Sequence, residues 1–169
     1  MTKDLIKLLI TEYQAYVTQV ELVHRDVELM DGLNYVFVGL RHAGKSYLMY
    51  QRIAQLLEQG HKREEILYFN FEDDRIDSLD VTDLDLIKTC YEEMYDSRPI
   101  FFLDEVQLVD RWEKFARRLA DQKYQPEFGI SDCRFSCYAR FPIGAYYICP
   151  PNNMDGKMQN CKVQMKFTL

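Results

Sequence analysis

The chain has 169 residues, 47% of them hydrophobic, and its 27 acidic and 21 basic side chains give a net charge of −6. This length and apolar content predict one domain with a sizeable core. No apolar run approaches the ~18 residues of a membrane span, and the amino-terminal sequence has no secretory pattern, so we expect a cytoplasmic protein without a membrane partner. No block of Lys and Arg stands out, and nucleic-acid binding is therefore not indicated.

Residues 1–32 read as a helical leader in front of the main domain. Apolar side chains recur near the helical period between Leu5 and Val20, within a charged background. This pattern predicts an amphipathic helix, and we expect its apolar stripe to cover an edge of the main domain. His24 and Arg25 follow in a charged segment, where side chains are most simply solvated.

The most informative stretch follows an apolar run, residues 33–38, that predicts a buried strand. It reads G-L-R-H-A-G-K-S and has the P-loop pattern G-x-x-x-x-G-K-S. Its two fixed glycines let the main chain approach a nucleotide's phosphates, and the helix that begins there directs unpaired N–H groups at negative charge. The pattern predicts that Lys45 reaches the β- and γ-phosphates and that Ser46 binds Mg²⁺. The predicted nucleotide-binding set is Gly39, Leu40, Arg41, His42, Ala43, Gly44, Lys45, Ser46 and Tyr47.

Two further elements lead from the P-loop helix toward a pair of acids. Gly60 predicts that the P-loop helix ends near Glu58. The apolar run at residues 66–71 then reads as a second buried strand. Thr82 has the form of an N-cap and predicts a helix that continues to about Tyr95.

A third predicted strand, residues 100–103, ends at Asp104 and Glu105. An apolar strand followed by Asp-Glu is the partner motif of the P-loop (Walker B), in which the aspartate completes the Mg²⁺ shell and the glutamate polarises the attacking water. The elements between Ser46 and Asp104 bring both motifs to the carboxyl edge of one parallel sheet, where such folds bind ligands. A further helix is predicted beyond the acids, with a buried face that carries Trp112, Phe115 and Leu119.

Four motifs in this order resemble those of a known family: G-L-R-H-A-G-K-S, I-L-Y-F-N-F-E-D, F-F-L-D-E-V-Q and W-E-K-F-A-R-R-L. They resemble the AAA-type P-loop ATPase domain of a large family of uncharacterised prokaryotic ATP-binding proteins, in which a domain of unknown function follows the ATPase core. The resemblance implies an α/β fold of the additional-strand P-loop class, a parallel sheet flanked by helices, with ATP and Mg²⁺ as ligands. It places Lys45 and Glu105 at catalytic positions and Ser46 and Asp104 at metal positions. Asn70 matches a polar position that can restrain the catalytic glutamate, although an amide that satisfies a loop backbone is an equal alternative.

The sequence departs from this family after the core, which we place at residues 33–125. Family members continue with an apolar strand that ends in a T-G-S-N-like sequence and lies between the P-loop strand and the Asp-Glu strand, and nothing resembling it follows here. We therefore expect a sheet that is incomplete at its C-terminus and a divergent tail, residues 126–169, that is truncated or frameshifted. Strand-like runs at residues 145–149 and 162–167 could substitute. Four of the five cysteines lie in this tail, which is a weak signal for zinc.

Three functions remain open on the sequence alone. In the first, the chain is an Mg²⁺-dependent ATPase in which Glu105 orients the attacking water. In the second, it binds ATP or ADP without turnover, because the sheet and the sensor are incomplete. The third is a phosphotransferase, which the Asp-Glu pair disfavours. AAA-type enzymes often complete their sites with a neighbour's arginine, so self-association is possible and Arg117 and Arg118 are candidates, although solvated helix charges explain both more simply.

Overall fold

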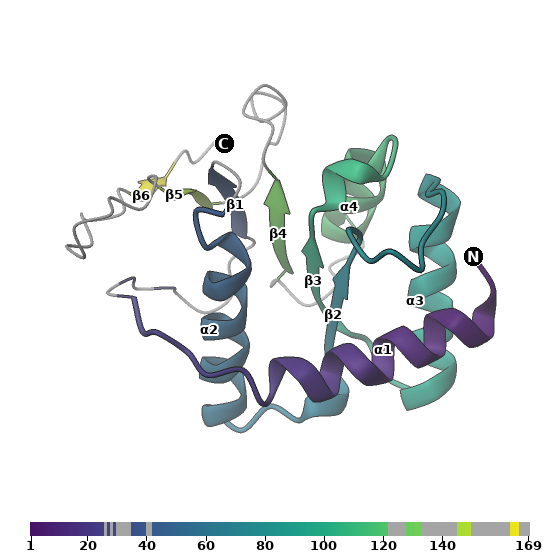
Figure 1. Cartoon of the computed structure of the whole chain (residues 1–169), viewed down its shortest axis with the longest axis horizontal. Helices are drawn as coiled ribbons and strands as arrows, with labels where there is room; N and C mark the ends of the chain where they lie inside the picture. Colours follow the sequence, from purple (N-terminus) through teal and green to yellow (C-terminus); the bar gives the residue numbers. More distant parts are fainter. Residues whose placement is uncertain are drawn as a thin grey trace.

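The computed structural model has a central, mainly parallel sheet with helices on both faces (Figure 1). The strands are β1 (Tyr35–Gly39), β2 (Ile66–Asn70), β3 (Ile100–Asp104), β4 (Phe128–Asp132), β5 (Ala145–Cys149) and β6 (Val163–Met165). They lie in the order β2-β3-β4-β1-β5-β6, and only the pair of β5 and β6 is antiparallel among the described strands. The structure describes residues 1–25, 27, 29, 35–39, 42–121, 128–132, 145–149 and 163–165.

The α-helices in the described ranges are α1 (Lys3–Val17), α2 (Lys45–Glu58), α3 (Val81–Tyr95) and α4 (Trp112–Asp121), and two short 3₁₀ helices are η1 (Arg63–Glu65) and η2 (Val106–Leu108). The predicted ends of α2 and α3 are confirmed, and Gly60 has the left-handed φ of 101° that terminates α2. The predicted start of α3 is wrong, because its N-cap is Asp80 rather than Thr82. Asp80 and Asp83 form a capping box in which each carboxylate accepts from the other residue's backbone N–H. None of the helices in the described part of the chain is long and apolar enough to cross a membrane.

Side chains on β2 and β3 alternate between the two faces of the sheet, and both faces are buried. Leu67, Phe69, Phe101 and Leu103 pack with residues of α3 and α4 on one face. Ile66, Tyr68, Ile100 and Phe102 pack with residues of α2 on the other. This burial on both faces explains why the two strands read as continuous apolar runs.

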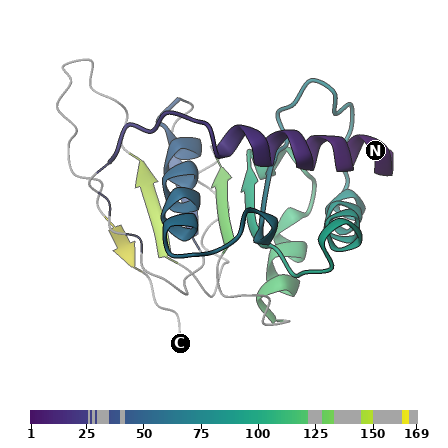
Figure 2. The ribbon, with the colours of Figure 1, turned by 90° about the horizontal axis from the view of Figure 1, so that it is seen from below.

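The leading helix α1 crosses the sheet at the edge strand β2 (Figures 1 and 2). Ile6 and Leu9 belong to the core on the side of α3 and α4, whereas Val17 belongs to the core on the side of α2. Between them Gln14, which is 2% exposed, donates its amide to the carbonyl of Ile66 at 2.9 Å. The helix therefore covers an edge of the main domain, as its amphipathic pattern predicts.

The expectation that no strand lies between β1 and β3 is wrong. β4 lies there and pairs in parallel with both neighbours, so that Ile130 is in register with Val36 and with Leu103. Its sequence, F-G-I-S-D, combines a glycine with polar residues, so neither an apolar run nor clear alternation marks it as a strand. The first strand of the predicted tail thus belongs to the central sheet. The strand-like runs farther along form β5, on the opposite side of β1, and the edge strand β6.

Candidate functional site

The P-loop joins β1 to α2. β1 ends at Gly39 and α2 begins at Lys45, with Gly44 as its N-cap. Gly44 has φ 81° and ψ 28°, in the left-handed region where a side chain would be strained. The first N–H groups of α2 have no partner within the helix, and they carry the positive end of its dipole. Leu40 and Arg41 of the predicted set lie outside the described residues.

A pocket of about 570 Å³ lies against the start of α2. It brings the P-loop together with the two acids at the end of β3. Its lining residues are Tyr16, Val23, Arg25, His42, Gly44, Lys45, Ser46, Tyr47, Tyr50, Asn70, Glu72, Asp104 and Glu105. Ala43 is not among them and is buried in the core on the side of α2. The sequence therefore predicts correctly that the P-loop and the Asp-Glu pair lie at the same edge of the sheet.

Asp104 ends β3 and is almost fully buried, with 2% of its surface exposed. Its carboxylate accepts a hydrogen bond from the Tyr68 hydroxyl at 2.7 Å. Because that hydroxyl has a single proton, Tyr50 is the donor in the 3.0 Å contact between the Tyr50 and Tyr68 hydroxyls. Burial, and after it the charge of Asp104, raises the pKa of Tyr68 well above its usual value, so the donor keeps its proton. Tyr68 therefore orients the Asp104 carboxylate in the pocket wall.

The oxygen atoms of Ser46 and Asp104 fit a magnesium ion. Ser46 lines the pocket from the first turn of α2, and Asp104 lines it from the end of β3. A hydroxyl and a carboxylate are the kinds of oxygen ligand that Mg²⁺ takes together with water and phosphate oxygens. The two residues predicted as metal ligands therefore have suitable chemistry and share one pocket.

Tyr68→Phe is expected to destabilise the chain by about 1–2 kcal/mol at neutral pH, because the buried Asp104 carboxylate loses a hydrogen-bond donor. The free energy of unfolding in urea measures this loss. Tyr50→Phe is the matched control, since it removes the contact between the two hydroxyls and leaves the bond to Asp104 intact. A loss in Tyr68→Phe no larger than that in Tyr50→Phe would show that Tyr68 does not support Asp104.

Glu105 follows Asp104 in a strained backbone conformation. Its φ of 53° lies in the left-handed region, which costs a non-glycine residue about 1 kcal/mol or more. One carboxylate oxygen lies 3.7 Å from the Nζ of Lys45, whose side chain is 3% exposed. The other oxygen accepts a hydrogen bond from the Gln107 amide. Two of the three residues predicted to be catalytic, Lys45 and Glu105, therefore form an ion pair in the pocket, and Asn70 is the third.

Asn70 ends β2 in register with Asp104. Its Oδ1 accepts a hydrogen bond from the backbone N–H of Glu72 at 3.0 Å, so the side chain satisfies the loop that follows β2. Asn70 also lines the pocket together with Glu105. The structural role of Asn70 is therefore present, whereas its restraint of Glu105 stays a prediction.

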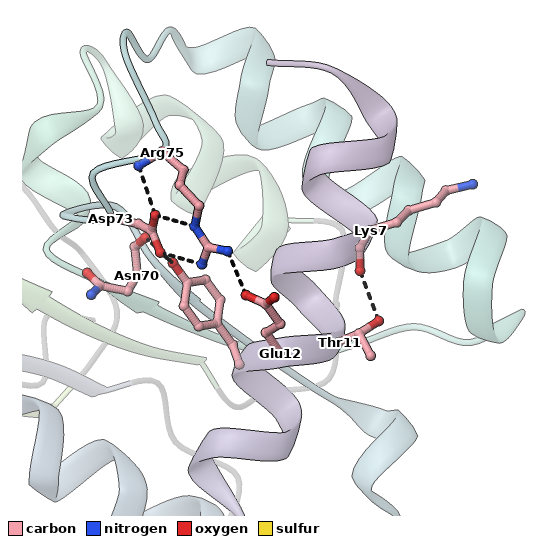
Figure 3. A network of polar contacts seen from close by, with 7 residues as sticks. Lys7, Thr11, Glu12, Asn70, Asp73 and Arg75 are labelled. Atoms are coloured by element: carbon pink, nitrogen blue, oxygen red, sulfur yellow. Dashed lines mark hydrogen bonds and ion pairs between the residues drawn. The ribbon is translucent and has the colours of Figure 1, made fainter.

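A polar network next to Asn70 joins α1 to the turn after β2 (Figure 3). The Tyr13 hydroxyl donates to Asp73 at 2.6 Å and lies 3.3 Å from the carbonyl oxygen of Asn70. Arg75 donates to Asp73 from its backbone and its guanidinium and forms an ion pair with Glu12 at 2.7 Å. The hydrogen bonds from Arg75, and then that from Tyr13, hold the pKa of Asp73 well below its usual value, whereas burial and Asp73 raise the pKa of Tyr13. The network holds the end of β2 against α1.

Several residues of this site carry no signal in a single sequence. Tyr50 and Tyr68 fall within the patterns of a helix and a buried strand, where a tyrosine reads as core. Arg25 reads as solvated, yet its guanidinium lies against Gly44 of the P-loop. Arg117 and Arg118 are the predicted candidates for completing the site of a neighbouring copy. Of these two, Arg118 forms an ion pair with Asp85 of the same chain.

Comparisons with known proteins give a family match and two partial relatives. A family model described as AAA domain matches residues 33–132, a range that ends with β4. The uncharacterized protein MJ1544 of Methanocaldococcus jannaschii is 32% identical over 106 residues, which are 62% of this chain and 23% of that protein. An uncharacterized protein of Haemophilus influenzae is 34% identical over 90 residues, which are 50% of this chain and 21% of that protein. The chain thus spans less than a quarter of the length of these relatives.

Proposed function

This chain belongs to the AAA domain family, and from that premise we propose that its pocket binds ATP together with Mg²⁺. We propose further that the site belongs to an ATPase, in which a water molecule attacks the γ-phosphate.

The observation that carries the proposal is the meeting of Lys45, Ser46, Asp104 and Glu105 in one pocket. Ligands of open parallel sheets bind at the carboxyl ends of the strands, where β1 and β3 end beside the start of α2. A helix start, a buried lysine and oxygen ligands for a metal are together the parts that a nucleoside triphosphate requires.

In the proposed site, each of these residues has a separate task. Lys45 holds oxygens of the β- and γ-phosphates, and Ser46 and Asp104 hold the metal. Mg²⁺ held by these two residues would offset the negative charge of the phosphates. Glu105 accepts a proton from the attacking water as the water oxygen bonds to the γ-phosphorus and the bond to the bridging oxygen breaks, releasing ADP. Before this step, the Glu105 carboxylate must part from the Lys45 ammonium and bind the attacking water instead. The incoming phosphates favour this change, because they compete with Glu105 for the ammonium.

Nucleotide binding is tested by the thermal and urea stability of the chain with and without ligand. MgATP at a hundredfold excess over its Kd is expected to raise the free energy of unfolding by about 2.7 kcal/mol. Adenosine with MgCl₂ is the control, because it has the base and the ribose but no phosphate for the P-loop. Equal stabilisation by adenosine and ATP, or none by ATP, would contradict the proposal.

A binding module without turnover is the second candidate. It is favoured by the contacts of Glu105, because one carboxylate oxygen faces Lys45 and the other accepts a hydrogen bond from Gln107. Self-association fits the proposed ATPase as well, since Arg117 is exposed on α4 and could reach a neighbouring copy's phosphates.

A further inference from the structure

A short segment between α1 and β1 covers one side of the pocket. We name residues 18–25 the N-terminal strap, which leaves the end of α1 and passes α2 (Figures 1 and 2). Val20 and Leu22 of the strap pack against the core on the side of α2. Beyond the strap, Val27 and Leu29 are buried in the same core. Apolar contacts therefore hold the chain on both sides of the last strap residue, Arg25.

Gln51 fixes the backbone of Arg25 against α2. The Gln51 amide Nε2 donates to the carbonyl oxygen of Arg25, and its Oε1 accepts from the backbone N–H of Arg25, each at 3.0 Å. Gln51 is 4% exposed, so water competes little for these two bonds. The strap thus holds the Cα of Arg25 at a defined place beside the P-loop helix.

The side chain of Arg25 lies against the P-loop. A Cβ placed on Gly44 would lie 2.1 Å from Nη2 of Arg25 and 2.8 Å from its Cζ. Arg25 and Lys45 line the same pocket, so two cations adjoin the amino end of α2, where the helix dipole is positive. Lys45 also pairs with Glu105 at 3.7 Å in this pocket. A phosphate between Arg25 and Lys45 would interact favourably with both cations.

We propose that Arg25 is a phosphate ligand of the bound nucleotide, carried into the pocket by the N-terminal strap; this inference rests on the proposed function. The guanidinium fork matches two phosphate oxygens. The backbone N–H groups of a P-loop surround the α- and β-phosphates, whereas its lysine reaches the β- and γ-phosphates. Because Arg25 lies at Gly44, it contacts the α- or β-phosphate and supports ADP and ATP alike.

The test measures the affinities of fluorescent ATP and ADP analogues with Mg²⁺ for the unmodified chain, Arg25→Ala and Arg25→Lys. Arg25→Ala is expected to weaken both nucleotides by a similar factor, roughly tenfold to a hundredfold. Arg25→Lys is expected to lose less affinity than Arg25→Ala, because lysine keeps the positive charge but lacks the paired N–H groups of the guanidinium. Lys62→Ala removes one exposed positive charge after α2 and is expected to leave both affinities unchanged. The Tm of Arg25→Ala without nucleotide checks that the variant retains its fold.

The outcomes separate this inference from the proposed function. Unchanged affinities in Arg25→Ala, alongside weakened binding in Lys45→Ala, would overturn the role of Arg25 and leave the nucleotide site intact. Tighter nucleotide binding by Arg25→Ala would also overturn the role of Arg25 as a phosphate ligand. It would show that the Arg25 side chain occupies the nucleotide's position and must be displaced before nucleotide binds. A loss of ATP affinity alone would overturn the assignment to the α- or β-phosphate. No binding by the unmodified chain would contradict the proposed function itself.

Discussion

Lys45→Ala is expected to lower the affinity for MgATP by roughly a hundredfold or more. The Lys45 side chain is 3% exposed, so the ammonium acts on phosphates with little screening by water. Its removal also takes away the ammonium that lies 3.7 Å from the Glu105 carboxylate, so the negative charge of Glu105 repels the incoming phosphates more strongly. Titration with a fluorescent ATP analogue measures the change.

The control for this variant is Lys62→Ala, which removes an exposed lysine beyond the end of α2. Its affinity for MgATP is expected to match that of the unmodified chain. Because Lys45 is buried, urea unfolding without nucleotide must show that Lys45→Ala retains its fold before affinities are compared. An unchanged affinity for MgATP in a folded Lys45→Ala variant would show that the P-loop is not part of the nucleotide-binding site.

Glu105→Gln is expected to preserve MgATP binding and to lower turnover by roughly 10²–10⁴-fold. The amide keeps the shape of the side chain, but it cannot accept the proton of the attacking water. The substitution also removes the negative partner of Lys45, which frees the ammonium for phosphate. The affinity for MgATP is therefore expected to stay equal or to rise. Single-turnover release of phosphate measures the chemistry, and analogue titration measures the binding.

Glu72→Gln is the matched control, because Glu72 is an exposed glutamate that lines the same pocket. Its turnover is expected to remain near that of the unmodified chain. A similar fall of turnover in both variants would mean that the charge of the pocket matters rather than a base at Glu105. If the unmodified chain binds MgATP and releases no phosphate, the binding module without turnover is the correct function.

The buried strands and the helix ends were predictable because their causes lie in neighbouring residues. β2 and β3 are covered on both faces, which produces continuous apolar runs. α2 ends where Gly60 adopts a left-handed φ of 101°. α3 shows the limit of such local signals, because Asp80 and Thr82 can each serve as an N-cap. The reciprocal bonds of Asp80 with Asp83 decide between them.

β4 was not predictable, because its position depends on partners that lie far away in the sequence. A glycine and two polar residues leave its pattern without a strand signal, and pairing with β1 and β3 supplies the stabilisation instead. The same reason applies to Tyr68 and Arg25. The first is 36 residues from Asp104, and the second contacts Gln51, 26 residues away.

The P-loop and the acids after the third strand can be identified without a structure, since each is a contiguous run of residues with a fixed spacing. Their position at the same edge of a parallel sheet also follows from the sequence, because strands alternate with helices between Ser46 and Asp104. Three features emerge from the folded chain alone: β4 separates β1 from β3, Tyr68 orients Asp104, and Arg25 lies against Gly44. These contacts join segments that are distant in the sequence. Their relative positions follow from strand order and side-chain packing, and the periodicity of the sequence specifies neither strand order nor packing.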